Sequence, residues 1–126
     1  MLYLDWVGPM CLSPGEVRKI PDLISGVYML HSFVPAIGGY PVFYVGRTID
    51  LRRRLLEHAG LSTKSSVLLF RSSAAAYFSA AAVLQSELLP RIEAGLIRAL
   101  LPPCNDQIPA AEPVLVDLPP LRATIP

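Results

Sequence analysis

Residues 44–58 have the sequence YVGRTIDLRRRLLEH, and the rest of the chain is organised around this stretch. The apolar and aromatic run at 42–45 is typical of a β-strand, and Gly46 indicates a turn after it. Asp50 has the short polar side chain that caps the first N–H groups of a helix. The stretch therefore predicts a strand that leads through a turn into a short amphipathic helix.

The predicted helix gathers polar side chains along one side. Leu51 and Leu55 are four residues apart and form its apolar face. Arg54 and His58 are also four apart, so both project along the helix next to that face. A strand that delivers Tyr44, followed by a helix that presents arginine and histidine, is typical of half of an active site. The other half is expected from elsewhere in the chain.

The composition indicates one domain that crosses no membrane. The chain has 126 residues, of which 52% are hydrophobic, and a mean hydropathy of +0.46. Its long uncharged run at 24–46 is interrupted by glycine and proline, so no transmembrane segment is expected. The first residues lack a basic region followed by an apolar one, so no signal peptide is expected. Cys11 and Cys104 match no metal-ligand spacing, which is typical of reduced thiols in an intracellular, cytoplasmic protein.

The net charge of +1 is small, but the basic residues are concentrated in one region. Residues 47–98 contain eight of the eleven lysines and arginines and four of the ten acidic residues. This excess surrounds the 44–58 stretch, where an anionic substrate would be held. For Arg52 and Arg53, a solvated helix face is the alternative.

Two predicted strands on either side of a glycine-containing loop indicate a hairpin. Residues 25–34 are rich in strand formers, 35–39 contain one proline and two glycines, and 41–45 begin the second strand. A turn centred in that loop places Tyr28 opposite Tyr44 on one face of the sheet, with a register defined to within two residues. Such a cross-strand tyrosine pair serves either packing or catalysis.

The remaining segments are less regular. Residues 1–24 are expected to be an irregular lead-in, with a capping pattern for a short helix near 13–19. Short apolar runs at 67–70 and 76–79 are candidates to complete a small sheet. The proline-rich tail, 107–126, is expected to be extended chain.

Residues 88–101 predict a second helix, which Pro90 either opens or weakens. Glu93 has leucine and isoleucine neighbours three and four residues away, so its carboxylate lies in an apolar stripe. A lone carboxylate is unfavourable to bury unless a cation or hydrogen-bond donors hold it. Glu93 therefore marks a functional site, or it is a structural glutamate at the helix edge or paired with an arginine. Beyond this helix, Asn105 either caps backbone groups or reaches into a site.

These residues resemble the signatures of the GIY-YIG nucleases. Gly26-Val27-Tyr28 and Tyr44-Val45-Gly46 are similar to the two triplets that give the family its name. Arg54 stands ten residues after the second tyrosine, where the family has an arginine. His58 stands four residues further, where the family often has a histidine or a tyrosine.

The resemblance continues to the end of the second predicted helix. Glu93 begins the sequence Glu-Ala-Gly-Leu-Ile, which is similar to the pattern around the family's metal-binding glutamate. Two prolines, at 102–103, and Asn105 follow at the expected distance. The resemblance covers residues 25–106, about two-thirds of the chain.

The resemblance implies a compact α/β domain at 25–106, with a central, mostly antiparallel three-stranded sheet flanked by helices. It implies a metal-dependent DNA endonuclease that hydrolyses phosphodiester bonds with one Mg²⁺ or Mn²⁺ ion. DNA is the expected partner, and the protein is expected to be a monomer that binds no membrane. The alternative is a catalytically inactive module with the same fold that binds nucleic acid or docks to a partner.

The resemblance also implies residue roles. Glu93 supplies an oxygen ligand for the metal ion, and Arg54 contacts the phosphate as its charge develops in the transition state. Tyr28 is expected to accept the proton of the attacking water, with His58 as a relay and Tyr44 as a positioning group. A tyrosine with an ordinary pKa of about 10 needs a nearby cation to act as a base at neutral pH. The predicted substrate-binding set is Arg47, Arg52, Arg53, Lys64 and Asn105.

Overall fold

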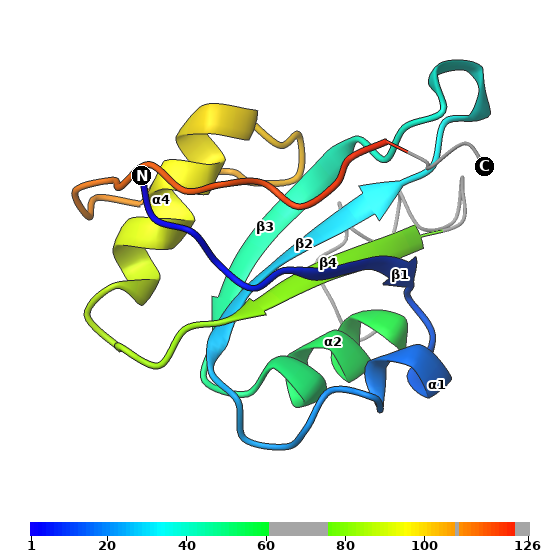
Figure 1. The fold of residues 1–126 in the computed structure, drawn as a ribbon, viewed down its shortest axis with the longest axis horizontal. Helices are drawn as coiled ribbons and strands as arrows, with labels where there is room; N and C mark the ends of the chain where they lie inside the picture. The colour runs from blue at the N-terminus through cyan, green and yellow to red at the C-terminus, as the bar shows by residue number, and fades with distance from the viewer. Residues whose placement is uncertain (61–75, 108, 123–126) are drawn as a thin grey trace.

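A four-stranded antiparallel sheet lies between helices in the computed structural model, which describes residues 1–60, 76–107 and 109–122 (Figure 1). Along the sheet the strand order is β1-β4-β2-β3. The elements in chain order are β1 (Val7–Cys11), α1 (Pro14–Val17), β2 (Gly26–Ser32), the 3₁₀ turn η1 (Pro35–Ile37), β3 (Val42–Thr48), α2 (Leu51–Ala59), β4 (Ala76–Ala82) and α4 (Leu89–Leu100).

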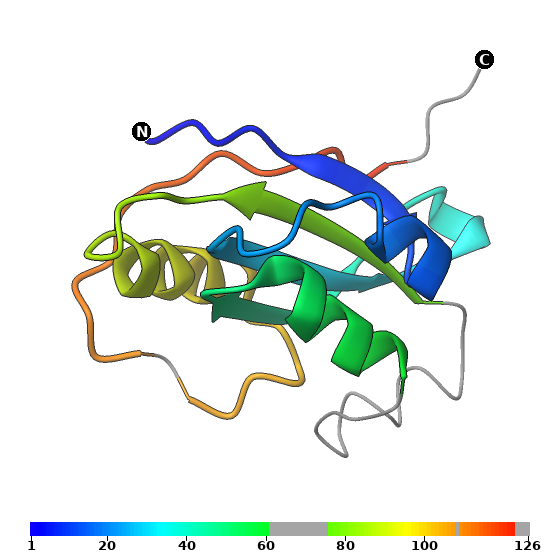
Figure 2. The same ribbon diagram turned by 90° about the horizontal axis from the view of Figure 1, so that it is seen from below.

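Each face of the sheet is covered by different helices (Figures 1 and 2). Alternate residues of β2 point to opposite faces, so Tyr28 and Leu30 pack with α1 and α2, whereas Val27 and Met29 pack with α4. All seven residues of β2 except the last are buried, because this central strand is covered on both sides.

The predicted α/β architecture is confirmed, but the sheet has four strands and not three. The additional strand is β1, in a lead-in that was predicted to be irregular. β1 is an edge strand, where Pro9, a residue without an N–H group, is tolerated. A bulge between Val7 and Met10 accommodates the extra residue. The predicted strand at 76–79 corresponds to β4, and the one at 67–70 lies outside the described residues.

The predicted hairpin register is off by two residues. Tyr28 pairs with Gly46, and Tyr44 pairs with Leu30. One residue of the difference comes from the position of the turn, since Val34 bridges to Gly39, and the other comes from a bulge between Leu30 and His31, where β3 contributes one more residue than β2. Tyr28 and Tyr44 still share one face of the sheet, as predicted, but they are diagonal neighbours.

The three predicted helices are present at the predicted places as α1, α2 and α4. The Asp50 side chain caps α2 by accepting a hydrogen bond from the Arg53 backbone N–H at 3.2 Å, and Leu51 and Leu55 are buried against the sheet. Pro90 lies in the first turn of α4, where a missing N–H group breaks no helical hydrogen bond. None of the helices in the described parts of the chain is long and apolar enough to span a membrane.

The described part of the tail, 109–122, is extended and packs against α4 and the first residues of the chain. Leu2 and Val116 form a parallel bridge, and Asp117 accepts hydrogen bonds from the Leu4 N–H and the Trp6 indole. At Gly95 on α4 an added Cβ would overlap the carbonyl oxygen of Val114. The segments predicted as lead-in and tail therefore lie side by side on the α4 face.

A buried histidine fixes the end of the hairpin. His31 is fully buried; its Nδ1 lies 3.1 Å from the Tyr40 carbonyl oxygen, and its Nε2 lies 2.8 Å from the Ser79 hydroxyl. Because a carbonyl only accepts, Nδ1 carries the proton and Nε2 accepts from Ser79. Burial lowers the pKa of His31 to about 4, although the hydrogen bond to Tyr40 acts in the opposite direction.

We therefore expect stability to fall in acid through His31. The unfolded state binds a proton below about pH 6.5, whereas the folded state resists protonation until about pH 4, so stability is lost as the pH falls through this window. The loss should reach about 3 kcal/mol. Urea unfolding at a series of pH values measures it, and His31→Gln should have a smaller slope than the wild type in this window. Equal slopes for the two proteins would contradict the assignment.

Candidate active site

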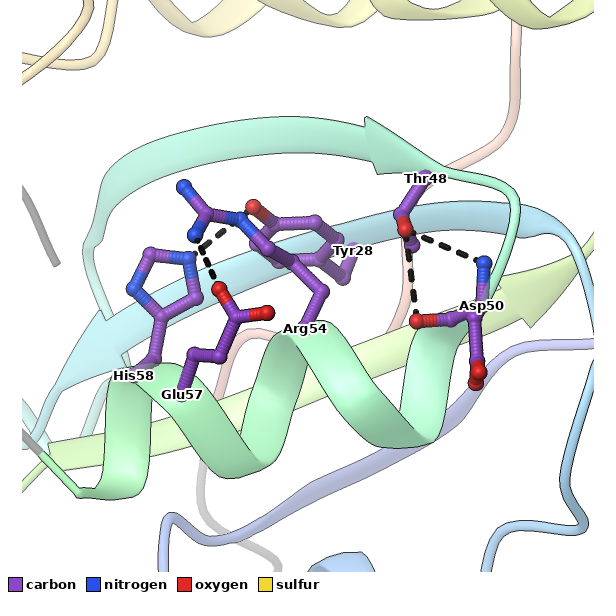
Figure 3. Close-up of polar contacts among 6 residues, drawn as sticks. All are labelled: Tyr28, Thr48, Asp50, Arg54, Glu57 and His58. Atoms are coloured by element: carbon purple, nitrogen blue, oxygen red, sulfur yellow. Dashed lines mark hydrogen bonds and ion pairs between the residues drawn. The ribbon is translucent and has the colours of Figure 1, made fainter. Parts of the chain in front are cut away.

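A hydrogen bond between Tyr28 and His58 joins the sheet to α2 (Figure 3). The Tyr28 hydroxyl and His58 Nε2 lie 2.9 Å apart, and both side chains are buried. His58 ends up beside the tyrosine because it lies one turn beyond Arg54 on the same side of α2. The predicted association of Tyr28 with the helix carrying Arg54 and His58 is therefore present in the fold.

Gly46 makes room for the Tyr28 ring. It lies inside β3, directly opposite Tyr28, and not in a turn as predicted. A Cβ at this position would overlap the Tyr28 ring and its hydroxyl oxygen. Gly46 of the second triplet is therefore needed for the packing of Tyr28 of the first triplet, because only a residue without a side chain leaves space for the aromatic ring.

Tyr44 completes a group of three rings. Its centroid lies 6.2 Å from that of Tyr28 and 5.7 Å from that of His58, with tilted ring planes. Its ring is partly buried, so the tyrosine borders both the core and the surface. The structure thus brings together the three residues predicted to handle a proton.

Arg54 adds a positive charge next to the Tyr28 hydroxyl (Figure 3). Its Nη1 donates to Glu57 Oε2 at 2.9 Å, and its side chain is 30% exposed. Burial raises the pKa of Tyr28, Tyr44 raises it further, and Arg54 opposes the increase. In the protein without a metal ion, the effects of burial and Tyr44 are larger than that of Arg54, so the pKa of Tyr28 is raised and its hydroxyl is a neutral phenol at physiological pH.

Glu93 is paired with Arg47, which lies on β3. Arg47 Nε is 3.4 Å from Glu93 Oε1, and the side chain of Glu93 is 15% exposed. Burial raises the pKa of Glu93, whereas the Arg47 charge and a hydrogen bond from the Arg47 backbone lower it. The Glu93 charge also contributes to the raised pKa of Tyr28, so the two groups interact electrostatically. Glu93 thus has the arginine partner that one sequence interpretation allowed.

Glu93 fits a metal ion that takes few protein ligands. Within 1–60, 76–107 and 109–122, three or more histidine, cysteine, aspartate or glutamate side chains do not gather in a group that could hold a metal ion. A closed protein cage is therefore not formed by these residues. Mg²⁺ often binds one or two carboxylates and completes its shell with water and substrate phosphate. A partly exposed hard oxygen ligand such as Glu93 suits that mode of binding.

The predicted substrate-binding arginines of α2 lie away from the Tyr28–His58 pair. Arg52 Nη1 donates to Asp22 at 2.9 Å, and Arg53 is exposed. Both line an open hollow of about 700 Å³ together with Asp22, Asp50 and Glu57, so this surface carries mixed charge. Lys64 lies outside the described residues.

Asn105 uses its amide to hold the edge of β3. Its Oδ1 accepts from the Val45 N–H at 2.9 Å, and its Nδ2 donates to the Val45 carbonyl at 2.8 Å. The neighbouring Cys104 N–H donates to the Phe43 carbonyl at 2.9 Å. Of the two interpretations of Asn105, the structure therefore shows backbone capping, in which both amide atoms bind Val45.

Glu57 was not predicted as part of this site, and Arg47 was predicted to bind substrate and not to pair with Glu93. Glu57 holds Arg54, and Arg47 holds Glu93. The three-residue spacing of Arg54 and Glu57 is a sequence signal for a helical ion pair and could have identified Glu57. No such signal exists for Arg47 and Glu93, because these residues meet only after α4 packs on β3.

The geometry defines a class of site: a buried tyrosine that is hydrogen-bonded to a histidine, with an arginine at its hydroxyl. Comparison with protein-family models and with curated proteins finds no match. Comparison with solved structures does find similar folds.

The solved structures are forms of one bacterial domain, the GIY-YIG N-terminal endonuclease domain of UvrC from Thermotoga maritima. An asparagine-to-alanine mutant bound to its catalytic divalent cation is 20% identical, with a TM-score of 0.56, covering 73% of this chain and 97% of that one. The magnesium-bound domain is 22% identical, with a TM-score of 0.54, covering 71% and 96%. The chain therefore has the GIY-YIG fold.

The position of Asn105 leads to a stability prediction. Asn105→Ala removes both partners of Val45 and should lower the free energy of unfolding by about 1–3 kcal/mol, because buried backbone groups lose their hydrogen bonds. Urea unfolding and hydrogen exchange of the Val45 amide measure the effect. The exposed neighbour Gln107 provides a control, Gln107→Ala, which should unfold like the wild type. Unchanged stability and unchanged Val45 exchange in Asn105→Ala would contradict the positioning role.

Proposed function

We propose that this chain is a metal-dependent endonuclease that hydrolyses phosphodiester bonds in DNA. The observation that carries the proposal is the Tyr28–His58 hydrogen bond with Arg54 beside the hydroxyl. It is supported by the likeness of the fold to an endonuclease domain that binds a catalytic divalent cation. The four parts of hydrolysis are metal binding, proton transfer, charge stabilisation and DNA positioning, and each has a candidate residue.

Glu93 would hold Mg²⁺ or Mn²⁺ through its carboxylate. When bound, such an ion supplies Lewis-acid polarisation of the phosphate and stabilisation of the leaving oxygen. The helix α4 and the Arg47 backbone fix the direction of the carboxylate. Because Glu93 is only 15% exposed, a substrate bound at this site would displace water from the carboxylate and from the metal ion.

Tyr28 and His58 would move the proton. The raised pKa keeps Tyr28 protonated, so a stored phenolate is not available as a base. A neutral hydroxyl can instead accept a proton from the attacking water while it gives its own proton to Nε2 of His58. The water oxygen then bonds to phosphorus and the bond to the leaving sugar oxygen breaks. That oxygen takes a proton from solvent, and the proton that Tyr28 gave up resides on His58. Tyr44, next to both rings, would position the water or the phosphate.

Arg54 would stabilise the negative charge that develops on the phosphoryl oxygens. Its ion pair with Glu57 restricts the guanidinium to the neighbourhood of the Tyr28 hydroxyl. Arg47, Arg52, Arg53 and Lys64 would contact flanking phosphates, which position DNA without selecting a sequence. Asn105 would act indirectly, by fixing the strand that carries Tyr44.

The first test is cleavage of supercoiled plasmid with and without Mg²⁺ or Mn²⁺. We expect metal-dependent nicking by the wild type and none by Glu93→Ala, whereas DNA binding measured by fluorescence anisotropy persists, because removing a carboxylate reduces repulsion of phosphate. Glu87→Ala, at an exposed glutamate, is the matched control and should cleave normally. DNA binding by the wild type without cleavage under any metal would favour the inactive binding module, and normal nicking by Glu93→Ala would remove Glu93 from the site.

The second test separates catalysis by Tyr28 from its packing. Tyr28→Phe keeps the ring and removes the hydroxyl that contacts His58, so single-turnover cleavage should slow by about two to four orders of magnitude with little change in DNA affinity. Tyr40→Phe removes a hydroxyl outside the site and should cleave like the wild type. Normal cleavage by Tyr28→Phe together with inactive Tyr44→Phe or His58→Ala would assign the proton to another residue.

A further inference from the structure

Arg47 and Glu93 form the ion pair that links α4 to the sheet among the described residues. The pair is asymmetric: the Arg47 side chain is 47% exposed, whereas that of Glu93 is 15% exposed. Arg47 contacts the carboxylate twice, through its guanidinium Nε at 3.4 Å and through its backbone. The backbone of Arg47 is fixed because it belongs to β3, whereas its guanidinium can change position because it is at the end of a long side chain.

A metal ion and the guanidinium would compete for Glu93. Both are attracted to the same carboxylate, and a divalent cation next to an arginine is repelled by it. The guanidinium can leave without loss of the fold, because it is nearly half exposed and a partly exposed ion pair contributes little to stability. The backbone contact remains when the guanidinium leaves, so Glu93 keeps its orientation.

We propose that Arg47 is a placeholder for the metal ion: its guanidinium holds Glu93 in the free protein and moves to a DNA phosphate when the ion binds. This inference rests on the proposed function, in which Glu93 is the metal ligand. Arg47 is a positioning residue, because it acts on the metal through Glu93. A phosphate that draws Arg47 away makes Glu93 available, so DNA and metal strengthen each other's binding by the same factor.

The binding of Mn²⁺ to the DNA-free protein, measured by the electron paramagnetic resonance signal of free Mn²⁺, tests the placeholder role. Arg47→Gln should bind Mn²⁺ about tenfold more tightly than the wild type, because one neighbouring positive charge is removed. Arg47→Lys keeps the charge and should bind as weakly as the wild type. Arg98→Gln makes the same charge change at an exposed position on α4 and should also match the wild type. Arg47→Met is a second neutral variant and should bind Mn²⁺ as tightly as Arg47→Gln. Thermal unfolding identifies any variant that does not fold.

The second measurement is DNA affinity, by anisotropy of a labelled duplex, with and without Mn²⁺ in a Tyr28→Phe background that keeps the duplex intact. Mn²⁺ should increase the affinity of the protein with Arg47 by a larger factor than that of the protein with Arg47→Gln. The placeholder role would be wrong if Mn²⁺ increased the DNA affinity of both proteins by the same factor. It would also be wrong if the wild type and both neutral variants bound Mn²⁺ equally while Glu93→Gln lost Mn²⁺ binding. Either result would leave the proposed function intact. Unchanged Mn²⁺ binding by Glu93→Gln would instead overturn Glu93 as the ligand and, with it, the proposed function.

Discussion

The hydrogen bond between the Tyr28 hydroxyl and His58 is the contact on which the rest of the site depends. It crosses the interface between β2 and α2 inside the core, where an unpaired hydroxyl or imidazole would be unfavourable by several kcal/mol, on the order of the cost of burying a lone polar group. Gly46 must lack a side chain for the tyrosine ring to fit, and the Asp50 cap must start α2 at the correct residue for His58 to reach it. The same residues, Gly46 and Asp50, are therefore required both for the packing of the core and for the hydrogen bond of the candidate active site.

The charges around this hydrogen bond are arranged in pairs. Arg54 lies against Glu57, and Glu93 lies against Arg47, so each candidate catalytic charge has a partner of opposite sign. Such pairs are partly exposed and contribute little to stability, but they orient long side chains before substrate binds. A phosphate and a divalent cation, which carry opposite charges, are suited to replace the partners. The pairs thus make the free protein nearly neutral at the site without removing the groups that hydrolysis requires.

The helices and the site residues on them could be predicted from the sequence because the signals are local. Asp50 and the spacing of Leu51 and Leu55 define α2 within a few residues. The strand β1 could not be predicted, since its tolerance of Gly8 and Pro9 depends on its place at the edge of the sheet. The hairpin register, the role of Asn105 and the Arg47–Glu93 pair likewise depend on a bulge and on packing between distant segments.

The proposed proton path requires the Tyr28 hydroxyl to donate its hydrogen bond to Nε2 of His58, and the tautomer of His58 reports the direction of that bond. Two-bond ¹H–¹⁵N correlation spectra of the imidazole distinguish a protonated from an unprotonated ring nitrogen. In the neutral side chain we expect the proton on Nδ1, with an unprotonated Nε2 whose resonance shifts in Tyr28→Phe because its hydrogen bond is lost. A neutral His58 with its proton on Nε2 would make Tyr28 the acceptor, and the proposed proton path would be wrong.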